Sequence, residues 1–221
     1  MDKMAIVKSV VGEFFNEFGI SEFGPGSVFM WIIVVIAAFA IAIAVERIYV
    51  IAIRSKINVD RFMTELIKLV RAKQFDKAIA LCDSAPEGAL SSMAKAGLRE
   101  IDRGGRQVQN AMDQACLSII PAIEKRTPYL FVFSNIATLA GLMGTIFGLM
   151  YTFKSLAVVP VAEQSKALAV GISAAMNTTI FGLIVAIPIV LVYQWLTSQS
   201  KQVIDDLDEQ SVRLINTIQE L

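Results

Sequence analysis

Three long stretches without a charged residue constrain this 221-residue chain more than any other feature of its sequence. The first begins at Val28 and is uncharged to Val45, the second runs from Tyr129 to Phe153, and the third from Ala167 to Leu196. After Glu46 and Arg47 the first stretch stays apolar to Ile53. At about 1.5 Å per residue, helices of this length match or exceed a bilayer core of roughly 30 Å. The pattern therefore predicts three membrane-spanning helices.

The polar sequence between and beyond these stretches completes the predicted organisation. We expect an all-α integral membrane protein with three transmembrane helices and a helical cytoplasmic domain. Its predicted segments are an N-terminal amphipathic helix, periplasmic or interfacial, over 1–27, transmembrane helix 1 over 28–53, a cytoplasmic helical domain over 54–128, transmembrane helix 2 over 129–153, a short periplasmic loop over 154–166, transmembrane helix 3 over 167–196, and a C-terminal cytoplasmic helix over 197–221.

Basic residues near the membrane predict the orientation. The polar insert, residues 54–128, joins the first two spans. Close to its two ends it carries Arg54, Lys56, Arg61, Lys125 and Arg126. By the positive-inside rule, the insert and the C-terminus lie in the cytoplasm and the N-terminus lies outside. The expected medium around the three spans is lipid. The chain has 20 basic and 20 acidic residues and no basic block, which argues against nucleic-acid binding.

The insert shows the apolar stripes of packed helices. One stripe consists of Phe62, Met63, Leu66, Ile67 and Val70, and a second of Phe75, Ala78, Ile79 and Cys82. Cys82 and Cys116 are the only cysteines and the chain has no histidine, so we predict neither a disulfide framework nor a metal site. No nucleophile, base and orienting group are recognisable together, and no cofactor motif is present, so the chain is not predicted to be an enzyme.

Small and hydroxyl-bearing residues form a stripe on each of the second and third spans. On the second span an arc of about 80° holds Ser134, Thr138, Gly141, Thr145, Gly148 and Thr152. A similar arc of the third span holds Gly171, Ala175, Thr178, Gly182, Ala186 and Tyr193, with Thr179 at its edge. Two explanations stand. The stripes serve close helix packing, as Gly144-x-x-x-Gly148 suggests, or they line a lumen shared by several subunits. Pro188 is expected to bend the third span.

Neither stripe contains Asp, Glu, Lys, Arg or His. A proton pathway normally needs such a group at membrane depth. If the chain conducts ions, the carboxylate has to come from another polypeptide.

The two stripes carry a resemblance to a known family. Gly141-Leu-Met-Gly-Thr145 resembles the GLLGT segment of the MotA/TolQ/ExbB channel family, and the segment from Ala174 to Pro188 resembles that family's third-helix motif. The segment from Arg71 to Cys82 is similar to the cytoplasmic helix of ExbB-type members. The likeness extends over nearly the whole chain.

The resemblance implies a function and a partner. It implies a ring of five channel subunits around two copies of a single-span partner of the ExbD, TolR or MotB kind, whose membrane Asp binds the ion. By motif, the threonines facing that Asp are Thr145 and Thr179, and Thr178 could share the role. Two positions depart from the family. Ala174 replaces a common Glu and Thr138 replaces a common Pro. The departures leave both H⁺ and Na⁺ open as the transported ion.

Our first hypothesis is therefore the channel-forming subunit of an ion-driven inner-membrane motor that couples ion flow to rotation and mechanical work. Outer-membrane transport, envelope maintenance, gliding and flagellar rotation are all open as the powered process. The alternative is a structural membrane scaffold without ion conduction, in which the stripes only pack helices. The predicted ion pathway comprises Thr138, Thr145, Thr178 and Thr179. The predicted packing or lumen-facing residues are Gly141, Gly144, Gly148, Gly171, Gly182 and Pro188.

Overall fold

The computed structural model describes residues 27–54, 59–85 and 88–220. The predicted amphipathic helix over 1–27 lies outside the described residues, apart from Ser27. All regular elements in the described ranges are helical, as predicted. They are α2 (Ser27–Arg54), α3 (Val59–Arg71), α4 (Phe75–Ser84), α5 (Ala89–Leu98), the 3-10 turn η1 (Ile101–Arg103), α6 (Gly105–Glu124), α7 (Thr127–Leu156) and α8 (Val161–Gln219).

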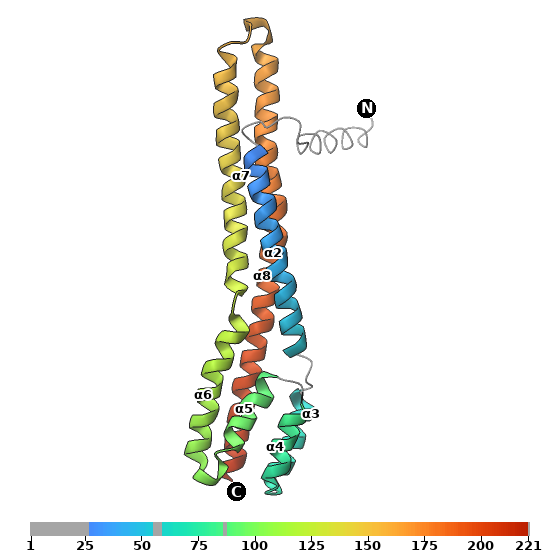
Figure 1. Ribbon diagram of the computed structural model, residues 1–221, viewed down its shortest axis with the longest axis vertical. Coiled ribbons are helices and arrows are strands. Elements are labelled where there is room, and N and C mark those ends of the chain that lie inside the picture. The colour runs from blue at the N-terminus through green and yellow to red at the C-terminus, as the bar shows by residue number, and fades with distance from the viewer. Residues whose placement is uncertain (1–26, 55–58, 86–87, 221) are drawn as a thin grey trace. The chain divides into compact units, whose positions relative to one another are not determined.

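These helices form two compact units (Figure 1). In its described part, unit 1 comprises residues 27–44 and 129–193, which are most of α2, nearly all of α7 and the first half of α8. Unit 2 comprises residues 45–128 and 194–220, which are the end of α2, the helices α3 to α6 and the last part of α8.

Unit 1 is a three-helix bundle whose outside is more apolar than its inside. Its outward side chains include large hydrophobic residues such as Phe39, Leu139 and Leu191, which are 61%, 62% and 66% exposed. Its interior instead holds small or hydroxyl-bearing side chains such as Ala137 and Ser134. In water such a surface would be strongly unfavourable, whereas in lipid it is the normal arrangement of packed spanning helices. Three helical stretches are long and apolar enough to cross a membrane, and the chain is a membrane protein.

Two exposed tyrosines mark the thickness of this apolar zone on α7. Tyr129 and Tyr151 are 58% and 57% exposed, and tyrosine favours the interface between lipid and water. They are 22 positions apart, which corresponds to about 33 Å along a helix. This distance matches a bilayer core of roughly 30 Å.

Unit 2 has an ordinary apolar core surrounded by charged residues. The predicted stripe on α3 is confirmed, because Phe62, Met63, Leu66 and Val70 are all buried. On α4 the buried positions are Ala78 and Cys82. The other core residues come from α5, α6 and the end of α8, and they include Leu90, Met93, Leu98, Val108, Met112, Ile123, Leu207 and Leu214.

Some of the predicted segment boundaries lie within helices of the structure. The third span over 167–196 and the C-terminal helix over 197–221 were expected as separate segments, but α8 is continuous from Val161 to Gln219. The polarity changes near residue 197, yet neither glycine nor proline occurs between Ile189 and Gln219, so nothing interrupts the backbone hydrogen bonds. The loop expected over 154–166 is also shorter, since only residues 157–160 separate α7 from α8.

Candidate functional site

Glycines hold α7 and α8 close together along one seam. A Cβ atom on Gly182 would lie 2.8 Å from the carbonyl oxygen of Ala137, and one on Gly148 would lie 2.8 Å from the Cβ of Ala175. A Cβ on Gly141 would lie 3.0 Å from the carbonyl oxygen of Thr178. Because these separations leave no space for a methyl group, the small residues permit a backbone approach that other residues would prevent.

The remaining predicted glycines also lie at helix contacts within the chain. A Cβ on Gly144 would lie 2.8 Å from Thr178 Oγ1 and 3.2 Å from the Cβ of Phe29 on α2. A Cβ on Gly171 would collide with the side chain of Thr152. The packing explanation thus accounts for all five predicted glycines, and their exposure to a lumen remains a prediction.

The seam brings the two motif threonines into direct contact. The hydroxyl of Thr145 on α7 and that of Thr179 on α8 are hydrogen-bonded to each other. Thr145 Oγ1 is also 3.2 Å from the carbonyl oxygen of Gly141, and Thr179 Oγ1 is 3.1 Å from the same oxygen. Both side chains are partly exposed, so the pair lies at the edge of the seam and is accessible from outside the chain.

The other two predicted pathway threonines occupy different surroundings. Thr178 is 2% exposed, and its hydroxyl lies 2.8 Å from the carbonyl oxygen of Ala175 and 3.2 Å from that of Gly141. Thr138 is partly buried and donates to the Ser134 carbonyl of its own helix at 3.1 Å. Thr178 is therefore part of the hydroxyl cluster but is covered by protein, whereas Thr138 makes only a local hydrogen bond.

The cluster is set in uncharged surroundings. Within the described part of unit 1, the helical segments 28–44, 129–153 and 167–193 contain no Asp, Glu, Lys, Arg or His. Lys154, nine positions from Thr145 on the same helix, is about 13 Å further along the axis. A charge that entered this site would have the threonine hydroxyls and the Gly141 carbonyl as its polar neighbours.

Pro188 and Ala174 lie elsewhere on α8. Pro188 lies within α8 and its side chain is exposed. As a proline it has no N–H to donate to the Ile184 carbonyl. Ala174, which stands where the resemblance leads one to expect a Glu, is about 140° around the helix from Thr179. A carboxylate at position 174 would consequently start from a different face of α8.

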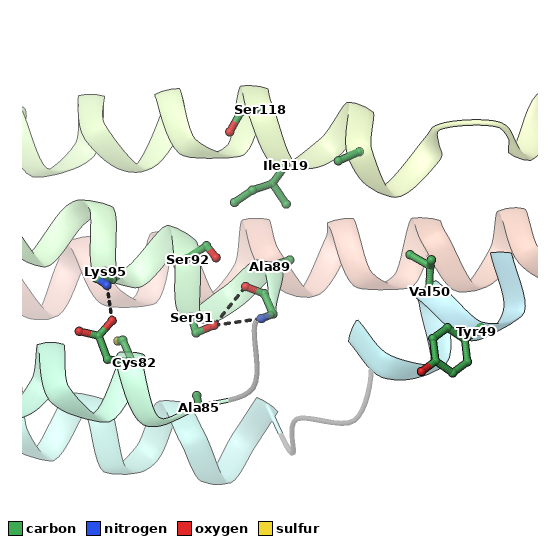
Figure 2. Close-up of a pocket in the computed structure, with 13 residues that line it drawn as sticks. Tyr49, Val50, Cys82, Ala85, Ala89, Ser91, Ser92, Lys95, Ser118 and Ile119 are labelled. Atoms are coloured by element: carbon green, nitrogen blue, oxygen red, sulfur yellow. Dashed lines mark hydrogen bonds and ion pairs between the residues drawn. The ribbon is translucent and has the colours of Figure 1, made fainter. Parts of the chain in front are cut away.

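Unit 2 contains a pocket of about 740 Å³ (Figure 2). It is lined by the end of α2 at Tyr49, by the α4–α5 region, and by α6 at Ser118 and Ile119. Its charged side chains, Lys95 and Asp83, are paired with each other. The Ser91 hydroxyl lies 3.2 Å from the Gly88 backbone nitrogen, at the start of α5. Lys95, Asp83 and Ser91 are thus engaged within the fold.

The two cysteines are protonated thiols under ordinary conditions. Burial raises the pKa of Cys82 from 9.0 to about 11, and the neighbouring Asp83 carboxylate adds to the rise. Burial likewise raises the pKa of Cys116. Both are free, and they pack as small apolar side chains, Cys82 in the core of unit 2 and Cys116 against it.

With this geometry in place, comparison with known proteins defines the class. Residues 86–209, more than half of the chain, match the model of the MotA/TolQ/ExbB proton channel family. The chain belongs to this family. The match includes both halves of the Thr145–Thr179 seam.

Individual relatives agree with this assignment. The chain is 26% identical over 198 residues to a biopolymer transport protein ExbB homologue of Methanothermobacter thermautotrophicus, covering 87% of this chain and 68% of that protein. It is 29% identical over 130 residues to the Tol-Pal system protein TolQ of Pseudomonas aeruginosa, covering 54% and 56% of the two chains. The fold also matches a chain in the structure of MotAB from C. jejuni, with a TM-score of 0.65 at 18% identity over 98% of this chain and 86% of that one.

Two features of the site were not predicted from the sequence. The Gly141 carbonyl is a shared acceptor for the threonine cluster, and the Ser134 hydroxyl donates across the seam to the Ala186 carbonyl at 3.2 Å. Ser134 was recognised as a stripe residue, but its partner depends on the pairing of α7 with α8. A stripe on one helix does not specify which carbonyl of the other helix it meets.

Proposed function

We propose that this chain is the channel-forming subunit of an ion-driven motor in the cytoplasmic (inner) membrane, and that Thr145 and Thr179 contact the moving ion or its carrier. The observation that carries the proposal is the hydroxyl pair at the edge of a lipid-facing bundle whose segments 28–44, 129–153 and 167–193 carry no charged side chain. A group of this kind can replace part of an ion's hydration without holding the ion permanently.

The bundle supplies no carboxylate of its own at this depth, so the carrier has to be a second polypeptide. We propose a single-span partner of the ExbD, TolR or MotB kind with an Asp in its membrane helix. The proposed assembly is a ring of five copies of this chain around two copies of that partner. Ion flow, carried by H⁺ or alternatively Na⁺, would drive rotation of one set against the other.

The proposed orientation places residues 54–128 and the C-terminus in the cytoplasm and the N-terminus outside. It is supported by an excess of basic residues on one side of the spans: Arg54, Lys56, Arg61, Lys125 and Arg126 on the side of residues 54–128, against Lys154 and Lys166 in the segment 154–166.

The experiment replaces each hydroxyl by a methyl group of similar volume. Thr145→Val and Thr179→Val should each abolish ion-driven output of the complete assembly while the protein still assembles. Ser173→Ala, which removes an exposed hydroxyl from another face of α8, is the matched control and should retain output. Normal output from both Val variants would defeat the assignment.

The alternative of a structural scaffold is supported by the five glycines, all of which pack within the chain. A scaffold needs no ion carrier. A neighbouring gene for a single-span protein with an intramembrane Asp therefore favours the motor, and unchanged membrane ion permeability in Thr145→Val and Thr179→Val assemblies favours the scaffold.

A further inference from the structure

The pocket in unit 2 has one wall formed by the end of a membrane span. Tyr49 and Val50 line the pocket, and both lie within two residues of Ile51, where the first span ends. Tyr49 is four positions past Val45, the last residue of the uncharged stretch, and is therefore about 6 Å further along α2. The headgroup layer on each side of a bilayer core is roughly 5–7 Å thick. This wall of the pocket thus lies at the depth of lipid headgroups.

An exposed apolar face of α2 leads from the lipid to this wall. Val45, Ile48 and Tyr49 are all exposed, and their spacing of three and four positions puts them on one side of the helix. Tyrosine also favours the boundary between lipid and water. An acyl chain that lay on this face would bring its headgroup to the mouth of the pocket.

The opposite walls carry one charge of each sign (Figure 2). Lys95 on α5 and Asp83 on α4 form an ion pair, and their side chains are 29% and 51% exposed. An ion pair that water reaches contributes little to stability, so its two charges can be exchanged for those of a ligand. A ligand with one negative and one positive charge matches this pair. A ligand with negative charge alone would be repelled by the Asp83 carboxylate.

Hydroxyl groups and free space complete the pocket. Tyr49 and Ser92 are exposed, and neither hydroxyl has a hydrogen-bond partner in the described part of the chain. The Ser118 hydroxyl donates to the Ala115 carbonyl at 2.8 Å and keeps its lone pairs for a donor. A volume of about 740 Å³ is in the range of small-molecule sites, so a headgroup fits inside.

We propose that this pocket binds the headgroup of a zwitterionic phospholipid that has a primary amine. The phosphate lies at Lys95 and accepts from the Ser92 hydroxyl, and the ammonium group donates to Asp83. Both contacts are charge-assisted hydrogen bonds, and the second requires an N–H on the amine. The acyl chains lie along the exposed face of α2. The site is independent of ion conduction, because a motor subunit and a scaffold would both present it to the lipid.

The test compares two lipids with identical acyl chains. The full chain, purified in detergent, is titrated with phosphatidylethanolamine and with phosphatidylglycerol, and mass spectrometry of the intact protein measures the lipid retained. We expect the ethanolamine lipid to bind more tightly. Glycerophosphoethanolamine, which is the same headgroup without acyl chains, should not displace it at equal concentration, because the face of α2 contributes to binding.

Substitutions at the ion pair assign each charge its role. Asp83→Asn should weaken binding of the ethanolamine lipid and strengthen binding of the glycerol lipid, each by about fivefold, because an attraction is lost in one case and a repulsion in the other. Lys95→Gln should weaken binding of both lipids. Glu65→Gln is the matched control, since it breaks the exposed Arg61–Glu65 ion pair on α3 and should change neither.

A variant that fills the pocket locates the lipid. Ser92→Trp places a large side chain in the pocket from an exposed position on α5, so it should exclude both lipids while the protein still folds.

Equal affinity of the unmodified chain for the two lipids would overturn the inference, as would an Asp83→Asn variant with unchanged preference. Lipid retained by Ser92→Trp as well as by Glu65→Gln would show that the lipid lies outside the pocket, which also overturns the inference. Displacement by glycerophosphoethanolamine at equal concentration would contradict a membrane lipid as the occupant.

Discussion

Arg126 and Glu46, 80 positions apart in the chain, are joined by a close ion pair in unit 2. One guanidinium nitrogen of Arg126 lies 2.6 Å from Glu46 Oε1 and 2.7 Å from Oε2. The pair links the end of α2 to the two-residue connection between α6 and α7. Arg126 itself has a backbone φ of 68°, in the left-handed region that is unfavourable for residues with a side chain.

The left-handed backbone of Arg126 leads to a prediction about two substitutions. Arg126→Gly and Arg126→Ala both lose the ion pair, but glycine adopts this φ without steric cost. We therefore expect Arg126→Gly to be the more stable by about 1 kcal/mol. Denaturation of the two detergent-purified variants measures the difference. Equal stability would show that the backbone at this position does not retain its left-handed conformation.

The glycine seam in unit 1 predicts a substitution that the fold does not tolerate. In Gly182→Ala the new methyl group would meet the backbone oxygen of Ala137, which cannot rotate away, so we expect a loss of roughly 1–3 kcal/mol. The matched control is Gly105→Ala in unit 2, where the nearest atom to a new Cβ is Gln219 Cγ at an ordinary 3.5 Å. Thermal denaturation in detergent should separate the two, and a Gly182→Ala protein as stable as the control would mean that α7 and α8 are further apart than described.

The buried thiol of Cys82 predicts a dependence on alkaline pH. With a pKa near 11 in place of 9.0, its thiolate is about a hundredfold scarcer at neutral pH than that of an ordinary cysteine. Alkylation by iodoacetamide should therefore be slow at pH 7.5 and accelerate well above pH 9. Cys116→Ser isolates the Cys82 signal, and rapid labelling of that variant at neutral pH would contradict the burial of Cys82.

The same pKa shift has a consequence for stability. The unfolded chain releases the Cys82 proton from about pH 9, whereas the folded chain retains it up to about pH 11. The stabilisation is thus fully present below pH 9 and is lost as the pH rises from 9 to 11. Cys82→Ala should remove this part of the alkaline destabilisation.

The helices could be predicted from the sequence because the residue types of each segment indicate whether lipid or water surrounds it. Uncharged runs indicate a helix surrounded by lipid. The stripe that includes Met63 and Leu66 indicates a helix with one face packed on protein and the other exposed to water. The continuity of α8 across the two predicted segments was not recognisable from residue types alone. A change of polarity at residue 197 changes the surroundings of a helix, but only a residue that breaks the hydrogen-bond ladder ends it.

The site was predictable in its residues but not in its contacts. Thr145 and Thr179 stand in recognisable motifs, whereas their sharing of the Gly141 carbonyl depends on how two helices pair across the seam. From the sequence alone, the glycines of the two stripes are explained equally well by helix packing and by lining of a lumen. The structure places them against α2, α7 or α8, and this leaves the hydroxyl pair to carry the functional proposal.

The most direct measurement is a cryo-electron microscopy structure of this chain co-purified with its single-span partner. We predict a closed ring in which α7 and α8 form the inner wall. At least one Thr145–Thr179 pair should lie within about 3 Å of a carboxyl oxygen of an enclosed helix. An inner wall formed by α2, or a central space without protein while both threonines face lipid, would contradict the account.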